Sequence, residues 1–391
     1  MSDTYSIRRF RSFSELPAPY VAVLGGGIER HGLFCEPEWF EYLMQNHFPA
    51  TDELRLYGVE EADSGRPLLL APLRYSTHDY GVRNARMIGS ISHPENFATA
   101  ALIFDPALED PAEVMVALFR HFRQGSPRAP AQRIDVVRIW PVELDSRLGE
   151  TVHRALRAAG FWLQSYANSY NRFENTKGMT YEAYFAQRSA NLRYSVRRRQ
   201  RALEKTGTLH VAIHRDEEGL EKAIFDYVFV SLASWKAPET TVADPIRRLI
   251  VLAARKGCLR LGILSVGGVP AAAQFWIVSA GTAHCARLAY HEAYKKQAVG
   301  VVLTSHMIAH VLDQDHVDKI DFGYGEEDYK GGWMKDARDY HGLLAFNATT
   351  PRGFFQALRH IAGRGAKRFV TRCASLLGWR KAKAEEAPQA E

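Results

Sequence analysis

The stretch TAHCARLAYHEAYKKQAVGVVLTSHM, residues 282–307, joins a strand-like run to a helix-like run through a short polar loop. Residues 299–315 repeat apolar side chains with the period of a helix. The start of such a helix has free backbone N–H groups and the positive end of the helix dipole, which favour a phosphate. Gly300 allows close approach of a ligand, and Lys295 and Lys296 add positive charge. The alternative is an ordinary turn with two solvated lysines.

The rest of the second half surrounds this stretch with elements in a definite order: helix, strand, two helices, three strands, helix, strand. VGGVP, residues 266–270, has the composition of a hairpin turn between two of the strands. Helices are expected at residues 181–188, 191–207, 217–235, 244–257 and 299–315, and strands at residues 209–215, 258–266, 269–280, 282–291 and 319–325.

The first half shows a similar order of elements less clearly, with expected helices at residues 36–48 and 111–124. Strands are expected at residues 53–62, 66–76, 98–105 and 133–142. Because each half ends in a helix and then a strand, the sequence predicts the same α/β unit twice. The expected division is residues 1–175, residues 176–350 and a basic amphipathic tail of residues 351–391.

Composition agrees with a folded protein of two domains. The 391 residues are 46% hydrophobic and 24% charged, and 50 Lys plus Arg face 44 Asp plus Glu. Four scattered cysteines form no C-x-x-C pair, so neither a zinc knuckle nor a disulfide framework is expected. No run of about 18 apolar residues is present, and we expect a cytoplasmic protein.

The loop carries a resemblance to a known superfamily. Residues 297–302 resemble the Q/R-x-x-G-x-G/A pyrophosphate loop of GNAT acyltransferases, with Val302 where Gly or Ala is usual. Over about residues 175–345 the chain resembles the CelD/BioF-like acetyltransferase group, which is related to Fem-type peptidyltransferases. The resemblance implies two tandem GNAT-like units with mixed, mostly antiparallel sheets flanked by helices. It also implies an acyl-CoA site in the second unit, formed by Gln297, Ala298, Val299, Gly300, Val301 and Val302.

The implied function is transfer of an acyl group, most simply acetyl from acetyl-CoA, to an amine of a sugar, an amino acid or a cell-envelope precursor. One alternative is a Fem-type transferase that takes an aminoacyl group from tRNA. Another is a non-catalytic peripheral scaffold in envelope polysaccharide assembly.

The stretch DFGYGEEDYKGGW, residues 321–333, would border the acyl-transfer cleft in this resemblance. Acyl transfer to an amine needs a group that takes a proton and a group that protonates the leaving thiolate. Asp321, or one of the two following glutamates, is a candidate for the first task, and Tyr329 for the second. Lys330 could bind an acidic substrate or an oxyanion. The structural alternative is that Asp321 caps a turn, Tyr329 packs and Lys330 pairs with an acid.

A basic helix and two aromatic residues are candidates for substrate binding. Residues 188–205 contain seven basic side chains and one acid, and Arg193 and Arg197 lie on one helix face that suits phosphate or carboxylate. A solvated helix face is the alternative. Trp235 and Tyr290 could line an acceptor pocket or belong to the core.

Two further stretches have weaker or more open interpretations. His306 and His310 have the spacing of metal ligands on a helix but no evident third ligand, so no metal site is expected. From Arg352 to Lys383 the tail holds nine Lys plus Arg and no acid, interleaved with apolar residues. Such a tail could bind an anionic membrane surface or pack on the protein.

Overall fold

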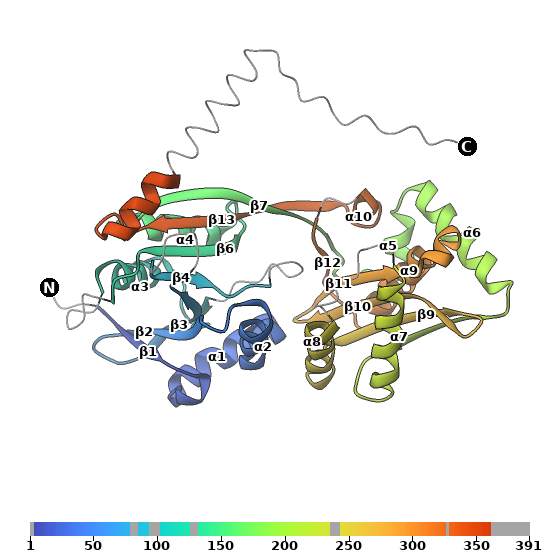
Figure 1. The fold of residues 1–391 in the computed structure, drawn as a ribbon, viewed down its shortest axis with the longest axis horizontal. Helices are drawn as coiled ribbons and strands as arrows, with labels where there is room; N and C mark the ends of the chain where they lie inside the picture. Colours follow the sequence, from blue (N-terminus) through green and yellow to red (C-terminus); the bar gives the residue numbers. More distant parts are fainter. Residues whose placement is uncertain are drawn as a thin grey trace, which may run out of the picture.

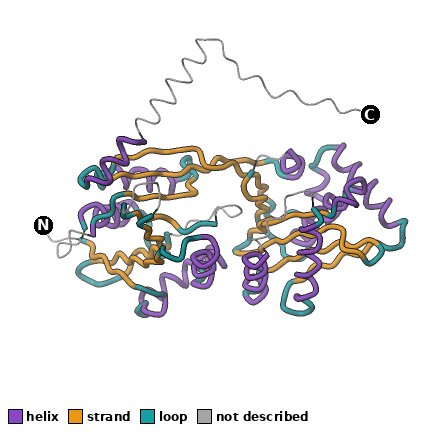
Figure 2. Tube along the Cα trace, viewed as in Figure 1, coloured by secondary structure: helices purple, strands orange, loops and turns teal. Residues whose placement is uncertain are grey.

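The computed structural model describes residues 4–78, 85–93, 102–125, 132–234, 243–325 and 328–360. Helices flank a sheet that runs the length of the molecule, with the first half of the chain at one end and the second half at the other (Figures 1 and 2). None of the described helices has the length and apolar composition needed to cross a bilayer.

The first half begins with a strand and two helices and ends with a long strand. Its elements are β1 (Tyr5–Phe10), η1 (Phe13–Glu15), α1 (Ala18–His31), η2 (Gly32–Cys35), α2 (Pro37–His47), β2 (Glu53–Glu61), β3 (Pro67–Ser76), β4 (Met87–Ser90), β5 (Ile103–Phe104), α3 (Ala112–Gln124), β6 (Val136–Val142), α4 (Arg147–Ala158) and β7 (Trp162–Asn175).

The second half opens with two helices and then repeats the order of the first. Its elements are α5 (Tyr181–Ala186), α6 (Ala190–Glu204), β8 (Leu209–His214), α7 (Leu220–Leu232), α8 (Ala243–Arg255), β9 (Leu259–Val266), β10 (Val269–Ser279), β11 (Thr282–Tyr290), η5 (Glu292–Gln297), α9 (Val299–Asp313), β12 (Lys319–Tyr324), α10 (Asp328–Trp333) and β13 (Asp336–Phe346). Apart from the short β5 and the 3-10 helices, the series from β1 to β7 and from β8 to β13 match element for element. The predicted repeat is therefore confirmed.

One continuous sheet joins the two units. Its strand order is β1-β2-β3-β4-β6-β13-β7-β12-β11-β10-β9-β8, with β5 paired to β3. The final strands are exchanged: β7 of the first unit pairs with β12, and β13 of the second unit pairs with β6. In the described pairings only β4 with β6 and β11 with β12 are parallel, as expected for a mixed, mostly antiparallel sheet. Because the strands are exchanged, the division at residues 175 and 176 stays a prediction.

Each unit has apolar clusters on both faces of its part of the sheet. In the second unit α7 and α8 cover one face, and α5, α6 and α9 cover the other. The first of these clusters also contains Phe34, Trp39 and Leu43 of the first unit. The two units therefore share a core as well as a sheet, and burial of this apolar surface favours their association.

A buried ion pair connects the end of β7 to the helices of the second unit. The Arg188 guanidinium donates to both Glu174 carboxylate oxygens, at 2.7 and 3.0 Å, and also to the carbonyl of Trp333. Both side chains are almost wholly buried. Arg188 is one of the seven basic residues of the segment 188–205, but its side chain is buried in this ion pair and does not face solvent.

The structure corrects several expectations. Residues 328–333 form helix α10 where a turn was expected. Of the strand expected at residues 98–105, the described part is only β5, and residues 94–101 lie outside the described residues. Residues 351–360, assigned to a tail belonging to neither unit, are helical, and Ala357 packs with Val136 and Leu344 of the first unit's sheet. The remainder of the tail lies outside the described residues.

Helix α1 was not predicted because its sequence contains three consecutive glycines, which disfavour a helix interior. The packing explains two of them. A Cβ on Gly27 would lie 2.4 Å from the Ile103 side chain, and one on Gly26 would lie 2.7 Å from Pro106. The glycines therefore let α1 lie close to the segment around β5, a requirement that only the tertiary structure reveals.

Candidate active site between β11 and β12

Strands β11 and β12 lie side by side at their start and then separate. Their parallel pairing runs from Thr282 with Lys319 to His284 with Asp321. Beyond His284 the remaining residues of β11, up to Tyr290, still pair with β10 but not with β12. From Leu288 to Tyr290 the backbone groups on this edge of β11 can therefore bond to a ligand that lies along the strand.

An extra residue interrupts each strand where the two separate. In β11 the register against β10 shifts between Phe275 and Trp276, so that Ala286 is the additional residue. In β12 the register against β7 shifts between Asp321 and Tyr324, and Gly323 has a φ of +65°. Bulges of this kind bend a strand and occur next to active sites. Here they open the gap between β11 and β12.

Asp321 maintains the irregular geometry of β12. Its Oδ1 accepts hydrogen bonds from the Gly323 N–H at 2.8 Å and from Asn171 Nδ2 at 2.7 Å. Its Oδ2 accepts from the Arg338 guanidinium at 2.8 Å, and Arg338 also donates to Asn171 Oδ1. The carboxylate is 5% exposed. These contacts favour a positioning role for Asp321, because both carboxylate oxygens are already engaged.

The loop after β11 leads to an uncapped helix start. Residues 292–297 form the 3-10 helix η5, and Ala298 follows with a φ of +50° as the N-cap residue of α9. No side chain caps α9, and the carbonyl of Ala298 accepts from Val301 and Val302. The first N–H groups of α9 thus have the arrangement that favours a phosphate. Lys295 is 3.0 Å from Glu292, which offsets its charge, whereas Lys296 and Gln297 are exposed.

Gly300 and Tyr290 bring the end of β11 against the start of α9. A Cβ on Gly300 would lie 3.5 Å from the Tyr290 ring, an ordinary van der Waals distance. Val299 and Val302 are wholly buried in the core cluster beneath α9. The side chain of Val302, at the position where the family has Gly or Ala, therefore points into the core.

Helix α10 closes the other side of the gap. Lys330 is 4% exposed, and its Nζ donates to the carbonyl of Tyr324 at the end of β12. Tyr329 is 43% exposed. The two glutamates before α10 lie outside the described residues. The predicted groups Asp321, Tyr329 and Lys330 thus gather at the end of β12, and their catalytic roles stay predictions.

The first unit contributes residues to this region that the sequence did not single out. Ser92, just after β4, hydrogen bonds to the Tyr324 hydroxyl at the end of β12. The next residue, His93, is buried, and its pKa is lowered well below the usual value by burial and by the charges of His47 and Arg287. Arg287 belongs to β11, beyond the point where β12 leaves it. No local pattern marks these residues, because they meet only through tertiary contacts.

In the first unit the corresponding strands are β4 and β6, and the Ser90 side chain connects them beyond their last backbone pair. β4 pairs in parallel with β6 as far as Gly89 and Arg138. Next to this pair, the Ser90 hydroxyl donates to the Trp140 carbonyl at 2.6 Å and accepts from the Trp140 N–H at 3.0 Å. At this point of the first unit a side-chain hydroxyl thus bonds to the backbone of β6.

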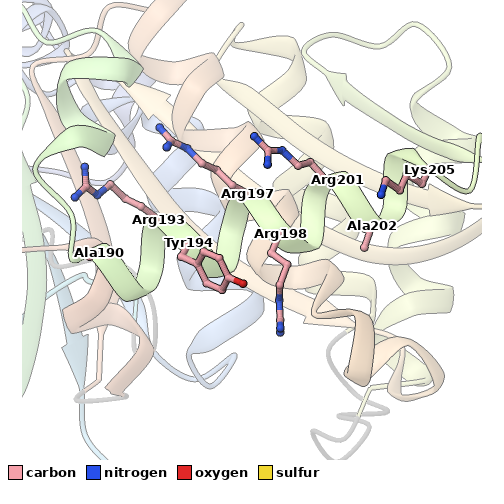
Figure 3. A pocket seen from close by; sticks show the side chains of 8 residues that line it. All are labelled: Ala190, Arg193, Tyr194, Arg197, Arg198, Arg201, Ala202 and Lys205. Carbon is pink, nitrogen blue, oxygen red and sulfur yellow. The ribbon is translucent and has the colours of Figure 1, made fainter.

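The predicted substrate-binding arginines lie on the outer face of α6. Ser189 caps this helix by accepting from the Leu192 N–H, and Val196 and Leu203 are buried beneath it, as predicted. Arg193 and Arg197 line an open groove along the helix (Figure 3). Of the predicted aromatic residues, Tyr290 borders the loop, whereas Trp235 lies outside the described residues.

The two histidines of α9 do not converge on a common point. His310 lies 3.9 Å from Asp315, which is also bonded to Arg260, whereas the charge nearest His306 is that of Glu204. In the described ranges no three His, Cys, Asp or Glu side chains are placed to hold a metal ion.

Because the pKa of His284 is lowered, we expect the folded protein to lose stability in acid. Burial, its largest influence, lowers the pKa of His284 to about 4, while the Asp321 charge acts in the opposite direction. Between pH 6.5 and 4 the unfolded chain binds a proton at this residue and the folded chain does not. The free energy of unfolding therefore decreases as the pH is lowered through this range, and the decrease levels off below pH 4. The expected loss is about 3 kcal/mol. Denaturant unfolding of the parent and of His284→Asn at several pH values measures it.

The control for this experiment is His210→Asn, which changes an exposed histidine on β8. This variant should follow the pH dependence of the parent, whereas His284→Asn should show a shallower one. Equal slopes for the parent and His284→Asn would show that other groups cause the acid dependence.

Comparisons with known proteins agree with this geometry. No curated protein sequence matches the chain. The crystal structure of FemX aligns with 80% of this chain and 96% of its own, at 10% identity and a TM-score of 0.50. A tandem GNAT protein from the clavulanic acid biosynthesis pathway aligns with 87% of this chain and 98% of its own, at 12% identity and a TM-score of 0.48.

At this identity the likeness to FemX shows the fold alone. Together with the internal repeat, it shows that the chain folds as two GNAT-like units in tandem. The matched family model, described as Acetyltransferase (GNAT) domain, covers residues 190–331. This range begins at α6, contains the split between β11 and β12, and ends within α10. The second half of the chain therefore contains an acetyltransferase domain of the GNAT superfamily, in the CelD/BioF-like group.

Proposed function

We propose that the protein transfers an acyl group, most simply acetyl, from acyl-CoA to an amine. The observation that carries this proposal is the edge of β11 at residues 288–290, where the described pairing with β12 has ended and which leads directly to the uncapped start of α9. An extended thioester arm along this edge would bond to backbone groups as a strand does. Its diphosphate would meet the first N–H groups of α9, within residues 297–302.

The reaction forms a bond between the amine nitrogen and the thioester carbon and breaks the bond from that carbon to sulfur. The amine loses a proton to a water molecule, and the departing sulfur takes one up from the proton donor. A backbone N–H group within residues 288–290 of β11 would bind the developing oxyanion. We assign the proton donor to Tyr329 and the binding of an acidic acceptor or the oxyanion to Lys330. Asp321 would act through Gly323, by keeping the gap open.

The acceptor amine would enter between the units, where Ser92 and His93 of the first unit lie near Tyr324 and Arg287 of the second. The acceptor class we propose is an amine of a sugar, an amino acid or an envelope precursor. Arg193, Arg197 and Tyr290 would contact its anionic or aromatic parts or those of the donor.

Calorimetric titration of the full chain with acetyl-CoA, with aminoacyl-tRNA and with buffer tests the proposal. We expect saturable binding of acetyl-CoA and, with a suitable amine, release of free thiol. Binding of aminoacyl-tRNA without acetyl-CoA would instead support a Fem-type transferase. Binding of neither would support the non-catalytic scaffold.

A further inference from the structure

The outer face of α6 carries a dense group of cations and an exposed aromatic ring: in Figure 3 Arg193, Arg197 and Arg201 extend from one edge of this face, and Tyr194 and Arg198 from the other. These side chains line an open groove of about 670 Å³, and Tyr194 is 68% exposed. The single acid of the helix, Glu204, accepts a hydrogen bond from Gln200. Among the described ion pairs none involves the cations of this face. We call Arg193, Tyr194, Arg197, Arg198, Arg201 and Lys205 the α6 basic face.

The spacing of these cations is unfavourable in the isolated protein. Arg193, Arg197, Arg201 and Lys205 follow one another at intervals of four residues, which is about 6 Å of helix rise. Like charges at this interval destabilise a helix by about 0.2–0.5 kcal/mol per pair. The opposite side of α6 is held in the core by Val196 and Leu203, so the side that carries the cations stays at the surface. An anionic partner would remove this repulsion.

We propose that the α6 basic face docks on an anionic lipid bilayer through Tyr194, Arg198, Arg201 and Lys205, while Arg193 and Arg197 keep the substrate contacts proposed above. Cations near such a surface each contribute about 1 kcal/mol to binding, and tyrosine is enriched at the interface between lipid and water. A helix with a buried apolar side cannot insert deeply, so the contact is made by the arginine and lysine head groups and by Tyr194.

A second patch favours lipid over nucleic acid. The helix of residues 351–360 exposes Phe354, Phe355 and Leu358, next to the half-exposed Trp162 of β7. This helix and α6 occupy the two upper corners of the molecule in Figure 1, so both lie toward one side. Apolar side chains of this kind can enter the acyl region of a bilayer. Aromatic rings can also stack on nucleic-acid bases, but the aliphatic Leu358 has no such partner in a nucleic acid.

Docking through α6 would place the candidate active site beside the membrane surface. Arg199 of α6 donates to the carbonyl of Lys296, just before the start of α9. At the other end of α6, a Cβ on Gly332 of α10 would lie 3.9 Å from Leu192. The helix therefore spans from the proposed CoA loop to α10, along the proposed site of acyl transfer.

Cosedimentation of the full chain with vesicles tests the proposal. The vesicles are phosphatidylcholine containing phosphatidylglycerol, and phosphatidylcholine alone. We expect binding to the anionic vesicles only, and release by added salt. A triple variant that combines Arg198→Gln, Arg201→Gln and Lys205→Gln should bind the anionic vesicles about 100-fold more weakly than the parent, since three lipid-facing cations are lost. Thermal unfolding should show that this variant stays folded.

The matched control removes three cations elsewhere, with Lys222→Gln, Arg247→Gln and Arg255→Gln on α7 and α8. These side chains are exposed and form surface ion pairs, which contribute little to stability. The control should bind like the parent. Equal weakening in both variants, or unchanged binding of the α6 variant, would overturn the proposal. So would a parent that binds single-stranded RNA but not anionic vesicles.

Discussion

Replacing Asp321 by alanine lowers the free energy of unfolding by about 3–5 kcal/mol, the usual cost of removing one partner of a buried ion pair. The change leaves Arg338 with only the partly exposed Glu143 carboxylate, 3.6 Å away, and removes the acceptor of the Gly323 N–H. Denaturant unfolding measures the loss. The sequence suggested that Asp321 acts in chemistry and that its substitution leaves stability little changed. The contacts of the carboxylate lead us to expect the opposite.

The matched control is Asp339→Ala, because Asp339 is an exposed aspartate of β13, close in sequence to Arg338. Its unfolding free energy should stay close to that of the parent. Unaltered stability of Asp321→Ala, with a steep loss of turnover, would restore Asp321 as a candidate for the group that takes the amine's proton.

The variant Gly300→Glu should bind acetyl-CoA about 100-fold more weakly than the parent, because like charges placed together cost several kcal/mol. The carboxylate would stand at the start of α9, where we propose that the diphosphate binds. Calorimetry measures the affinity. Gly300→Ala is the control for added bulk, since its Cβ would meet the Tyr290 ring at an ordinary distance of 3.5 Å.

Gly300 is buried, so the glutamate variant could also disturb the fold. Gln297→Glu places the same charge on an exposed residue of η5 and should weaken binding without changing thermal unfolding. Undiminished binding of acetyl-CoA by both folded variants would place the donor site elsewhere.

Local pattern predicted the elements of the second unit well, because its helices and strands are long and strongly periodic. The hairpin between β9 and β10 is an example. Gly267 and Gly268 both have positive φ, as a tight two-residue turn requires. Helix α10 was read as a turn because Gly331 and Gly332 disfavour a helix, whereas burial of Lys330 and Trp333 accompanies the helix in the folded chain.

The elements of the first unit were harder to predict, and the reasons are physical. β4 is short, and it depends on pairing with strands that lie elsewhere in the chain. β7 is long, but its partners β12 and β13 belong to the second unit, far away in the sequence. β13 of the second unit was not predicted either, and it depends in the same way on β6 and β7 of the first unit. Such partners leave no trace in local periodicity.

The sequence by itself determined the repeat of the α/β unit, the strand, loop and helix around Gly300, and the basic outer face of α6. These features follow from the period of apolar residues and from the position of glycine, which act over a few residues. The tertiary structure alone decided that β11 and β12 separate, that Asp321 bonds to Asn171, and that Ser92 and His93 reach the second unit. Asn171 and Asp321 are 150 residues apart, and only the folded sheet brings their side chains within hydrogen-bonding distance.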